Sequence, residues 1–246
     1  MGILARSLAA TYYGGHHIER HSHKWGQLIY AARGVMHVEA DAAVWIVPPA
    51  RAVWVPAAVP HEIFARGEFA MRSVYIAPDC AWTAPGKCAG VEVSPLLREL
   101  ILRIVELGFL EAETREHQAL FDLSLISLAA AERLPTRLVL PRDRRGRCAA
   151  ERLMTEPSTV IRLPELARIS GASPRTLQRI FLEETGLGFA EWRQRARLTH
   201  AASLLSPTCS VTEAGLDAGY ASTSAFIAAF GRAFGCTPAA FRARAL

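Results

Sequence analysis

Three histidines and a glutamine in the first quarter of the chain have the types and spacing of metal ligands. His21, His23 and Gln27 share parity, so in an extended strand all three side chains face one side. His61 has to arrive from a neighbouring strand. Imidazole ligands suit zinc, nickel and copper, and a set without a carboxylate favours these ions over iron or manganese. The sequence therefore predicts a divalent transition metal such as Zn or Ni, or else a metal-free ligand pocket in which these side chains bond to one another.

A second set of residues, in the last third of the chain, has the chemistry to read DNA. Arginine and glutamine can each form two hydrogen bonds to a base edge, and arginine also binds phosphate. The alternative is a helical hairpin with solvated arginines, because the chain uses arginine for nearly every cation. The predicted DNA contacts are Ser173, Arg175, Thr176, Gln178 and Arg179.

The elements that carry this second set have the pattern of a helix-turn-helix. Apolar residues indicate a first helix over Leu163 to Ile169, and Gly171 ends it. Ser173 then stands at an N-cap position, and Pro174 occupies the favoured first position of a second helix. In this motif the start of the second helix lies in the major groove.

A second copy of the same design follows over Val211 to Phe234. A short helix, a break at Gly219 and a cap at Ser222 precede a helix whose phenylalanines recur every four residues. Between the copies, Phe189 to Leu205 is expected to form one helix of about 25 Å. Such a helix can hold two recognition helices near the major-groove repeat of about 34 Å. The predicted contacts of the second copy are Ser222, Thr223, Ser224 and Arg232.

Residues 148 to 246 resemble the DNA-binding domain of the AraC/XylS family of bacterial transcription regulators. The resemblance lies in the run Leu-Gln-Arg-Ile-Phe-Leu-Glu-Glu-Thr-Gly at 177 to 186 and in matches between Ala218 and Pro238, with Phe241-Arg242 closing the motif. It implies a double helix-turn-helix that binds promoter DNA. Gly231 stands where the family usually has a basic residue, and the second recognition helix has few base-reading groups. We therefore expect the first unit to supply most of the sequence discrimination.

Residues 10 to 78 have the pattern of a small β-barrel, with short apolar runs separated by glycine and proline. Within it, the segment from His21 to Gln27 resembles the first cupin motif, and Pro56 to His61 resembles the second. Cupin metal sites commonly use three histidines and a glutamate. Here Gln27 replaces the glutamate, and Ala58 replaces the usual glycine.

Four aromatic residues of the same region are candidates for an effector pocket, although such residues are more often part of a core. The mouth of a small apolar barrel is a suitable place for a small effector. The predicted pocket residues are Trp25, Tyr30, Trp45 and Trp54.

Charge is distributed unevenly along the chain, whose formal net charge is +5. Residues 141 to 246 contain 15 arginines against nine acidic residues, whereas residues 1 to 140 contain 13 basic against 14 acidic residues. The basic excess coincides with the helix-turn-helix units, as phosphate binding requires. Neither a membrane span nor a signal peptide is indicated, and five cysteines without Cys-x-x-Cys spacing indicate neither a disulfide framework nor a zinc ribbon. We expect a cytoplasmic protein without a membrane partner.

The sequence thus predicts an α+β protein with two domains, a cupin-like β-barrel with flanking helices and an all-α double helix-turn-helix. The apolar stripes of helices at 94–105 and 116–134 close the barrel, and the family resemblance implies that they also form a homodimer. Prolines and an arginine cluster at 135–147 are typical of a linker. The expected segments are a sensor barrel at 1–90, a helical subdomain at 91–134, the linker at 135–147 and the DNA-binding domain at 148–246.

The predicted function is that of a sequence-specific transcription regulator, not an enzyme. Its expected partners are double-stranded promoter DNA, a small-molecule or metal effector, and a second copy. The main alternative is a cupin-type metal-dependent enzyme fused to a DNA-binding module, with His21, His23 and His61 as ligands. The replacement of a charged ligand by Gln27, and the lack of an acid or base paired with the site, argue against it. A third interpretation is a DNA-binding protein whose barrel is filled by side chains.

Overall fold

The computed structural model describes residues 2–13, 15–65, 67–78, 85–134, 137–158, 161–205 and 209–243. These residues form two compact units. Most residues up to Arg137 belong to the first, and residues from Leu138 onward belong to the second, together with Ala42–Val44. The first unit is rich in strands and the second is helical, which confirms the predicted two-domain α+β organisation. None of the helices in the described ranges is long and apolar enough to cross a membrane.

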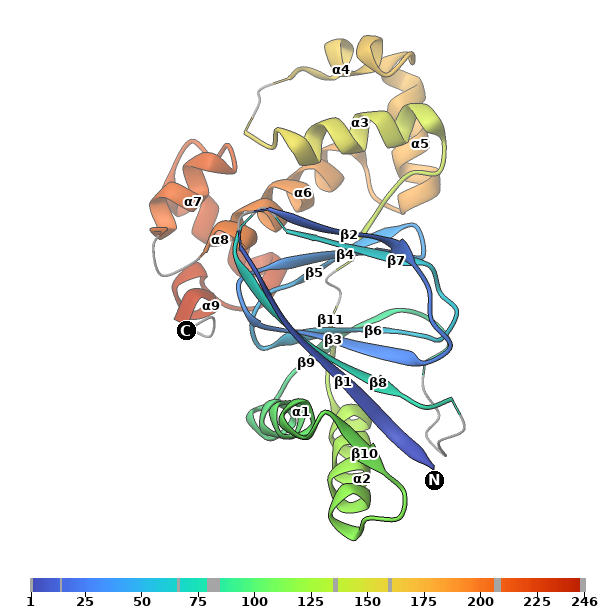
Figure 1. The fold of residues 1–246 in the computed structure, drawn as a ribbon. Coiled ribbons are helices and arrows are strands. Elements are labelled where there is room, and N and C mark those ends of the chain that lie inside the picture. The colour runs from blue at the N-terminus through green and yellow to red at the C-terminus, as the bar shows by residue number, and fades with distance from the viewer. Residues whose placement is uncertain are drawn as a thin grey trace. The chain divides into compact units, whose positions relative to one another are not determined.

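The described strands form two separate sheets, where the sequence predicts a cupin-like β-barrel (Figure 1). A seven-stranded sheet has the order β10-β1-β8-β3-β6-β9-β11, and a five-stranded sheet has the order β12-β5-β4-β7-β2. The strands are β1 (Ile3–Tyr12), β2 (His16–His21), β3 (Gly26–Arg33), β4 (Met36–Ala40), β5 (Ala43–Val47), β6 (Arg51–Val55), β7 (His61–Ala65), β8 (Phe69–Ile76), β9 (Ala89–Glu92), β10 (Phe109–Glu111), β11 (Arg133–Leu134) and β12 (Arg137–Val139).

Side-chain alternation in β3 explains why the seven-stranded sheet is buried on both faces. Ile29 and Ala31 point to a core shared with residues of the five-stranded sheet, such as Val38. Leu28 and Tyr30 point to the opposite face, where they join a second core. A continuous apolar run such as this one marks a strand covered on two sides, which a barrel with a single interior does not provide.

Two helices, α1 (Pro95–Leu107) and α2 (Arg115–Ala130), cover that second face (Figure 1). The Ser94 hydroxyl caps α1 by accepting a hydrogen bond from the Leu97 backbone N–H at 3.2 Å. Gly108, with φ of 84°, ends α1. Both predicted helices are confirmed, although α2 ends earlier than expected.

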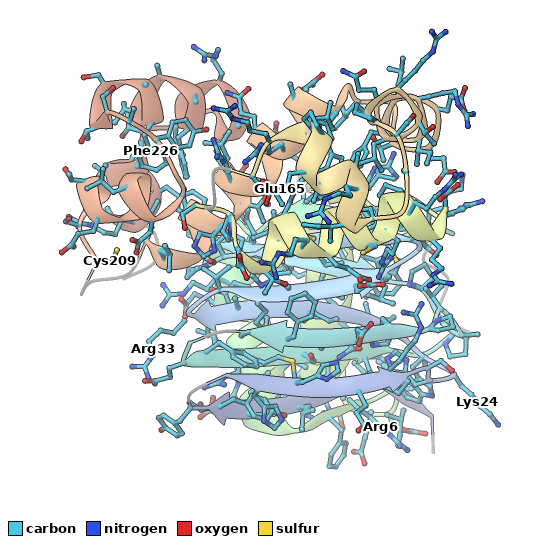
Figure 2. All side chains as sticks on the ribbon, turned by 90° about the horizontal axis from the view of Figure 1, so that it is seen from above. Arg6, Lys24, Arg33, Glu165, Cys209 and Phe226 are labelled. Carbon is cyan, nitrogen blue, oxygen red and sulfur yellow. The ribbon has the colours of Figure 1, made fainter. Side chains whose placement is uncertain are left out.

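The second unit contains two helix-turn-helix pairs joined by one long helix. Trp192 and Leu198 are buried on opposite halves of the long helix, and Phe226 of the second pair is also fully buried and lies between helices (Figure 2). The described helices are α3 (Arg144–Thr155), α4 (Leu163–Ile169), α5 (Pro174–Thr185), α6 (Phe189–Leu204), α7 (Val211–Asp217), α8 (Thr223–Phe234) and α9 (Pro238–Ala243). Their bounds match the helices predicted from the sequence around both units.

The segment 135–147, predicted to be a linker, contains β12 and the start of α3. Asp143 is the N-cap of α3, and its carboxylate accepts a hydrogen bond from the Arg145 backbone N–H at 2.9 Å. Gly146 packs so closely that a Cβ there would lie 2.6 Å from the Ile180 side chain. The arginine-rich run is therefore part of the folded second unit, because a local cap and a close helix contact order it.

Candidate nucleic-acid interface and histidine cluster

The first recognition helix, α5, begins as the sequence predicts. The Ser173 hydroxyl accepts a hydrogen bond from the Thr176 backbone N–H at 3.1 Å, and the two hydroxyl oxygens lie 2.8 Å apart. Leu177, Ile180 and Phe181 are buried against the rest of the unit. The hydroxyl groups of the two cap residues are therefore bonded within the helix. The face of α5 opposite its buried side chains is left for contact with a partner.

That opposite face presents three polar side chains with different partners. Arg175, Gln178 and Arg179 are all exposed. Arg179 forms an ion pair with Glu183 at 2.7 Å. In the described part of the chain, Arg175 and Gln178 form no side-chain hydrogen bond or ion pair. The two side chains best suited to base edges are thus the two that are free to reach them.

The second recognition helix, α8, presents fewer groups that can read a base. The Ser222 hydroxyl caps it by accepting from the Ala225 backbone N–H at 3.2 Å, and Thr223 donates to the Thr212 hydroxyl at 3.4 Å. Ser224 and Arg232 are exposed, and Arg232 is the only charged residue of α8. The structure places all four predicted residues on or beside α8, with two of them engaged in local bonds.

Helix α6 holds both recognition helices. Near its start, Trp192 packs edge-on against Phe181 of α5 with ring centroids 5.0 Å apart, and its indole N–H donates to the Val139 carbonyl at 2.6 Å. Near its end, Leu198 shares a buried cluster with Phe226 of α8. With 16 residues, α6 is about 24 Å long, and Figure 1 shows the two pairs at its opposite ends.

The basic excess of this unit is not all available to phosphate, because several of its arginines have internal partners. Arg193 donates to the Ile161 carbonyl at 2.8 Å, and Arg197 donates to the Pro157 carbonyl at 3.1 Å. Burial and the nearby Arg197 lower the pKa of Arg193. In the described part of this unit, six arginines make neither an ion pair nor a side-chain hydrogen bond: Arg142, Arg144, Arg162, Arg168, Arg175 and Arg232.

The histidine cluster of the first unit brings together the four predicted ligands from both sheets. His21 at the end of β2 pairs with His61 of β7 across the five-stranded sheet. His23 lies in the loop after β2, and Gln27 belongs to β3 of the seven-stranded sheet. Candidate ligand atoms of the three histidines lie within 4.8 Å of one another.

The cluster is not formed by one extended strand whose alternate side chains face one side, as the sequence predicts. Strand β2 ends at His21 and β3 begins at Gly26, so residues 21 to 27 do not form one extended strand. A register shift in β2 between Ile18 and His21, together with the loop, brings His21 and His23 to one site. The structure brings the predicted residues together, but loop geometry and not strand parity assembles them.

Every histidine of the cluster is oriented by a backbone carbonyl. The Nδ1 atoms of His21 and His61 lie 2.8 and 2.9 Å from the carbonyl oxygens of Glu19 and Val59, and Nδ1 of His23 bonds to a carbonyl in the same way. A carbonyl only accepts, so the proton lies on Nδ1 and leaves the Nε2 lone pair for a ligand. This is the arrangement that metal-binding histidines usually have.

Burial keeps the innermost histidine neutral. His61 is fully buried, and this burial lowers its pKa to about 4, with His21, His23 and Arg20 lowering it further. At neutral pH its imidazole therefore has the protonation state that a metal requires.

The glutamine of the site is held by two residues that sequence reasoning missed. The Gln27 amide N–H donates to the Ser73 hydroxyl at 2.9 Å and to the Tyr75 hydroxyl at 3.1 Å. Both hydroxyls belong to β8, which pairs with β3 so that Gln27 lies opposite Tyr75. Only the pairing of distant strands brings them to the site, and the sequence carried no local signal for it.

The four aromatic residues predicted to line one effector pocket do not share one. Trp45 lies in the core between the two sheets, whereas Tyr30 and Trp54 lie in the core beneath α1 and α2. Trp25 instead packs under the Arg6 guanidinium, 5.1 Å from its ring centre. The alternation of strand side chains sends these residues to different faces.

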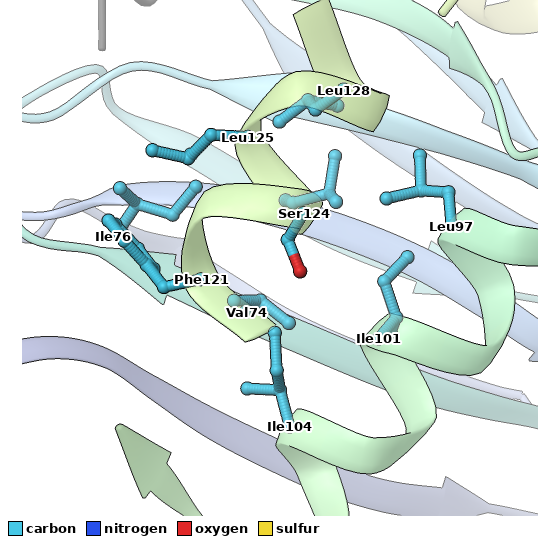
Figure 3. A pocket seen from close by; sticks show the side chains of 10 residues that line it. Val74, Ile76, Leu97, Ile101, Ile104, Phe121, Ser124, Leu125 and Leu128 are labelled. Carbon is cyan, nitrogen blue, oxygen red and sulfur yellow. The ribbon is translucent and has the colours of Figure 1, made fainter. Parts of the chain in front are cut away.

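A small apolar pocket lies instead between the seven-stranded sheet and the two covering helices (Figure 3). Its only polar side chain is Ser124, whose hydroxyl donates to the Leu120 carbonyl at 2.6 Å. The lining residues are Leu28, Val74, Ile76, Leu97, Ile101, Ile104, Phe121, Ser124, Leu125 and Leu128.

Comparisons with known proteins agree with both units. A family model described as the AraC-like ligand binding domain matches residues 5–131, and one described as a helix-turn-helix domain matches residues 166–244. The chain is 31% identical over 224 residues to the HTH-type transcriptional regulator NimR of Escherichia coli, covering 91% of this chain and 82% of NimR.

Two further proteins match in different ways. The HTH-type transcriptional regulator RipA of Corynebacterium glutamicum is 43% identical over 110 residues, which cover 45% of this chain and 33% of RipA. The crystal structure of ToxT from Vibrio cholerae aligns with 98% of this chain and 94% of its own, with a TM-score of 0.41 at 9% identity. Since the ligand-binding model alone spans more than half of the residues, the chain belongs to the AraC family of DNA-binding transcriptional regulators, with an N-terminal ligand-binding domain and a C-terminal helix-turn-helix domain.

Proposed function

We propose that this regulator, acting on promoter DNA in the cytoplasm, responds to a divalent transition metal held by His21, His23, Gln27 and His61. The observation that carries this proposal is that each of the three imidazoles has its Nδ1 on a backbone carbonyl, while candidate ligand atoms of all three lie within 4.8 Å of one another. Bound metal would supply a charge that draws the two sheets' ligands together. For regulation, the metal must bind one arrangement of the protein better than another.

The donor set points to the class of metal. Three imidazoles and a neutral amide suit zinc, nickel or copper better than iron or manganese, which prefer carboxylates. The expected experiment is a calorimetric titration of chelator-treated protein with zinc and nickel chloride, followed by a measurement of DNA affinity with and without metal. Metal binding that leaves DNA affinity unchanged would refute the regulatory role.

Variants of the cluster separate sensing from DNA binding. We expect the double variant His21→Ala, His61→Ala to keep its DNA affinity and to lose the metal response. Because His61 is fully buried, the more exposed His21 also serves alone, as His21→Ala. A redox metal together with turnover of a co-purifying molecule would instead favour the alternative, a cupin-type metal-dependent enzyme fused to a DNA-binding module.

On the DNA side, we propose that α5 supplies most of the base discrimination and α8 mainly positions the second unit. Support comes from Arg175 and Gln178 on α5, which are exposed and have no side-chain partner in the described ranges, against a single charged residue on α8. Selection of bound duplexes from a random pool tests this. We expect one strongly preferred half-site and one degenerate half-site, and equal information in both would contradict the proposal.

We also propose that α1 and α2 carry a homodimer interface. Leu123 and Ile126 on α2 and Leu96 on α1 expose 41, 65 and 53% of their surfaces, so two neighbouring helices present three large apolar side chains to a partner. We expect Ile126→Glu to convert a dimer into a monomer in light scattering. The matched control is Leu8→Glu, at an exposed leucine on β1, and loss of the dimer in both variants would argue against this interface.

A further inference from the structure

Gln27 lies between the histidine cluster and two buried hydroxyl groups, and its amide contacts both. Its Oε1 atom lies 2.8 Å from His23 Nε2 and 3.0 Å from His61 Nε2. On its other side, Nε2 donates to Ser73 and Tyr75. Only 1% of Gln27 is exposed, and Ser73 is fully buried, so water has little access to either.

The orientation of the amide conflicts with the imidazole tautomers, because acceptor atoms of two rings face the acceptor oxygen of Gln27. The Nδ1 atoms of His23 and His61 face carbonyl oxygens, so in the tautomer of each ring that carries one proton this proton lies on Nδ1. Their Nε2 atoms are then acceptors, and both face the amide oxygen, which is also an acceptor. Three lone pairs converge in a buried site with no proton between them, an arrangement that proteins avoid.

Two changes remove this conflict while each ring keeps a single proton. A cation among the three atoms turns all of them into ligands, and the amide keeps its orientation. Without a cation, rotation of the amide by about half a turn places its NH₂ group toward the imidazoles, so that it donates one hydrogen bond to each.

The hydroxyl groups on the far side can serve both orientations. A hydroxyl both donates and accepts, so Ser73 and Tyr75 can accept from NH₂ in one state and donate to Oε1 in the other. His23 also packs edge-on against the Tyr75 ring, with centroids 5.1 Å apart, which keeps that hydroxyl beside the amide. A backbone carbonyl or an ammonium group in these positions would fix a single orientation.

We propose that Gln27 is a two-position ligand, whose amide oxygen binds the metal and whose NH₂ group replaces the metal between His23 and His61 when the metal leaves. This inference rests on the proposed metal-sensing function. It explains why an amide stands at this position: the hydrogen bonds of the rotated amide compensate the cluster for loss of the ion. The site is therefore built for reversible occupancy, whereas a carboxylate could neither donate to the imidazoles nor release the cation as readily.

Metal affinity tests the ligand role of Gln27 in the full-length protein. Zinc and manganese chloride are titrated into wild type, Gln27→Glu and Gln27→Leu, with circular dichroism as the check on folding. We expect Gln27→Leu to lower zinc affinity about 10- to 100-fold, the range found for groups that support a metal site. We expect Gln27→Glu to raise affinity at least tenfold, with a larger gain for manganese than for zinc.

Ser73→Ala and Tyr75→Phe provide milder variants that leave all four ligands in place. Each removes one acceptor of the amide NH₂ group, so each should weaken zinc binding severalfold. Equal zinc affinity of wild type and Gln27→Leu would overturn the ligand role while leaving a tri-histidine site intact. Failure of wild type to bind zinc or nickel would instead refute the proposed metal-sensing function itself.

Nuclear magnetic resonance tests the rotation. The Gln27 NH₂ signals are assigned as those that Gln27→Glu removes. In metal-free protein we expect their nuclear Overhauser contacts to reach ring protons of His23 and His61, and after zinc addition to move to Ser73 and Tyr75. Contacts to Ser73 and Tyr75 in both states would overturn the rotation.

Discussion

Arg179 and Glu183 form an ion pair at 2.7 Å along the exposed face of α5, one turn beyond Arg175, which has no ion pair among the described residues. The charge of Arg179 is therefore partly neutralised by Glu183, whereas the charge of Arg175 is available to DNA. The two arginines should therefore contribute differently to the recognition of bases.

Arg175→Ala and Gln178→Ala should each weaken binding to the selected site by about 1 to 3 kcal/mol and relax discrimination at one base position. Both side chains are exposed and free in the described part of the chain. Arg179→Ala should cost less, because Glu183 already competes for its charge. Fluorescence anisotropy with the selected duplex and single-base variants measures these effects. An equal loss on every sequence would identify Arg175 as a phosphate contact instead.

Glu183→Gln should have the opposite effect and strengthen binding to all duplexes. It removes a negative charge near the phosphates and releases Arg179 from its ion pair. Because each additional phosphate contact steepens the dependence of log K on log salt by about 0.9, we expect a slope larger by roughly one unit. The matched control is Glu99→Gln on α1, an exposed glutamate of the first unit, which should leave the slope unchanged. A gain restricted to one sequence would contradict this explanation.

The helix-turn-helix units could be predicted from the sequence because local rules determine them. Ser173 and Ser222 cap the recognition helices, and Gly171 and Gly219 adopt the positive φ values of 69° and 80° that end the preceding helices. These signals lie within a few residues of the structure that they produce, so helix bounds followed directly.

The histidine cluster could be predicted only in part. Motif spacing identifies its candidate ligands, but the residues that hold Gln27 in place reach the site only through strand pairing. Tyr75 lies opposite Gln27 through the pairing of β3 with β8, and no spacing rule relates positions so far apart. The division of the predicted barrel into two sheets could not be read from the sequence for a related reason. The apolar run of β3 has two buried faces. The sequence predicted that two helices close the barrel, but not that α1 and α2 cover one face of the sheet that contains β3.

We expect substitution of Ala58 by glycine to raise the stability of the first unit. Its φ of 63° lies in the left-handed region, and its backbone N–H donates to the His23 carbonyl at 2.8 Å, which ties this turn to the histidine cluster. Ala58→Gly should stabilise the first unit by about 0.5 to 1 kcal/mol, because it relieves a backbone cost of roughly 1 to 2 kcal/mol and loses part of that gain to the entropy of the unfolded chain.

The neighbouring Ala57 provides the control for this prediction, since it is exposed and its φ is not positive. Ala57→Gly should destabilise the protein by roughly 0.4 to 1 kcal/mol through the unfolded chain alone. Urea unfolding followed by tryptophan fluorescence compares the two variants. Equal changes in the two midpoints would show that the turn carries no strain.

We expect the carboxylate of Asp143 to stabilise the second unit in a pH-dependent way. Its carboxylate bonds to the Arg145 guanidinium at 2.8 Å and caps α3, and these bonds lower its pKa well below the usual range, Arg145 making the largest contribution. A carboxyl group whose pKa is lowered by folding stabilises the folded state fully above the unfolded pKa of about 4, and this stabilisation is lost as the pH falls below that value. Asp143→Asn keeps a capping oxygen and removes the charge, so wild type should be the more stable protein at pH 7 and the difference should shrink by pH 3. Urea midpoints from the helical circular dichroism signal measure the stability difference between wild type and Asp143→Asn at each pH. The control is Asp217→Asn, at the exposed end of α7. A difference that stays constant from pH 7 to pH 3 would show that the charge of Asp143 does not stabilise α3.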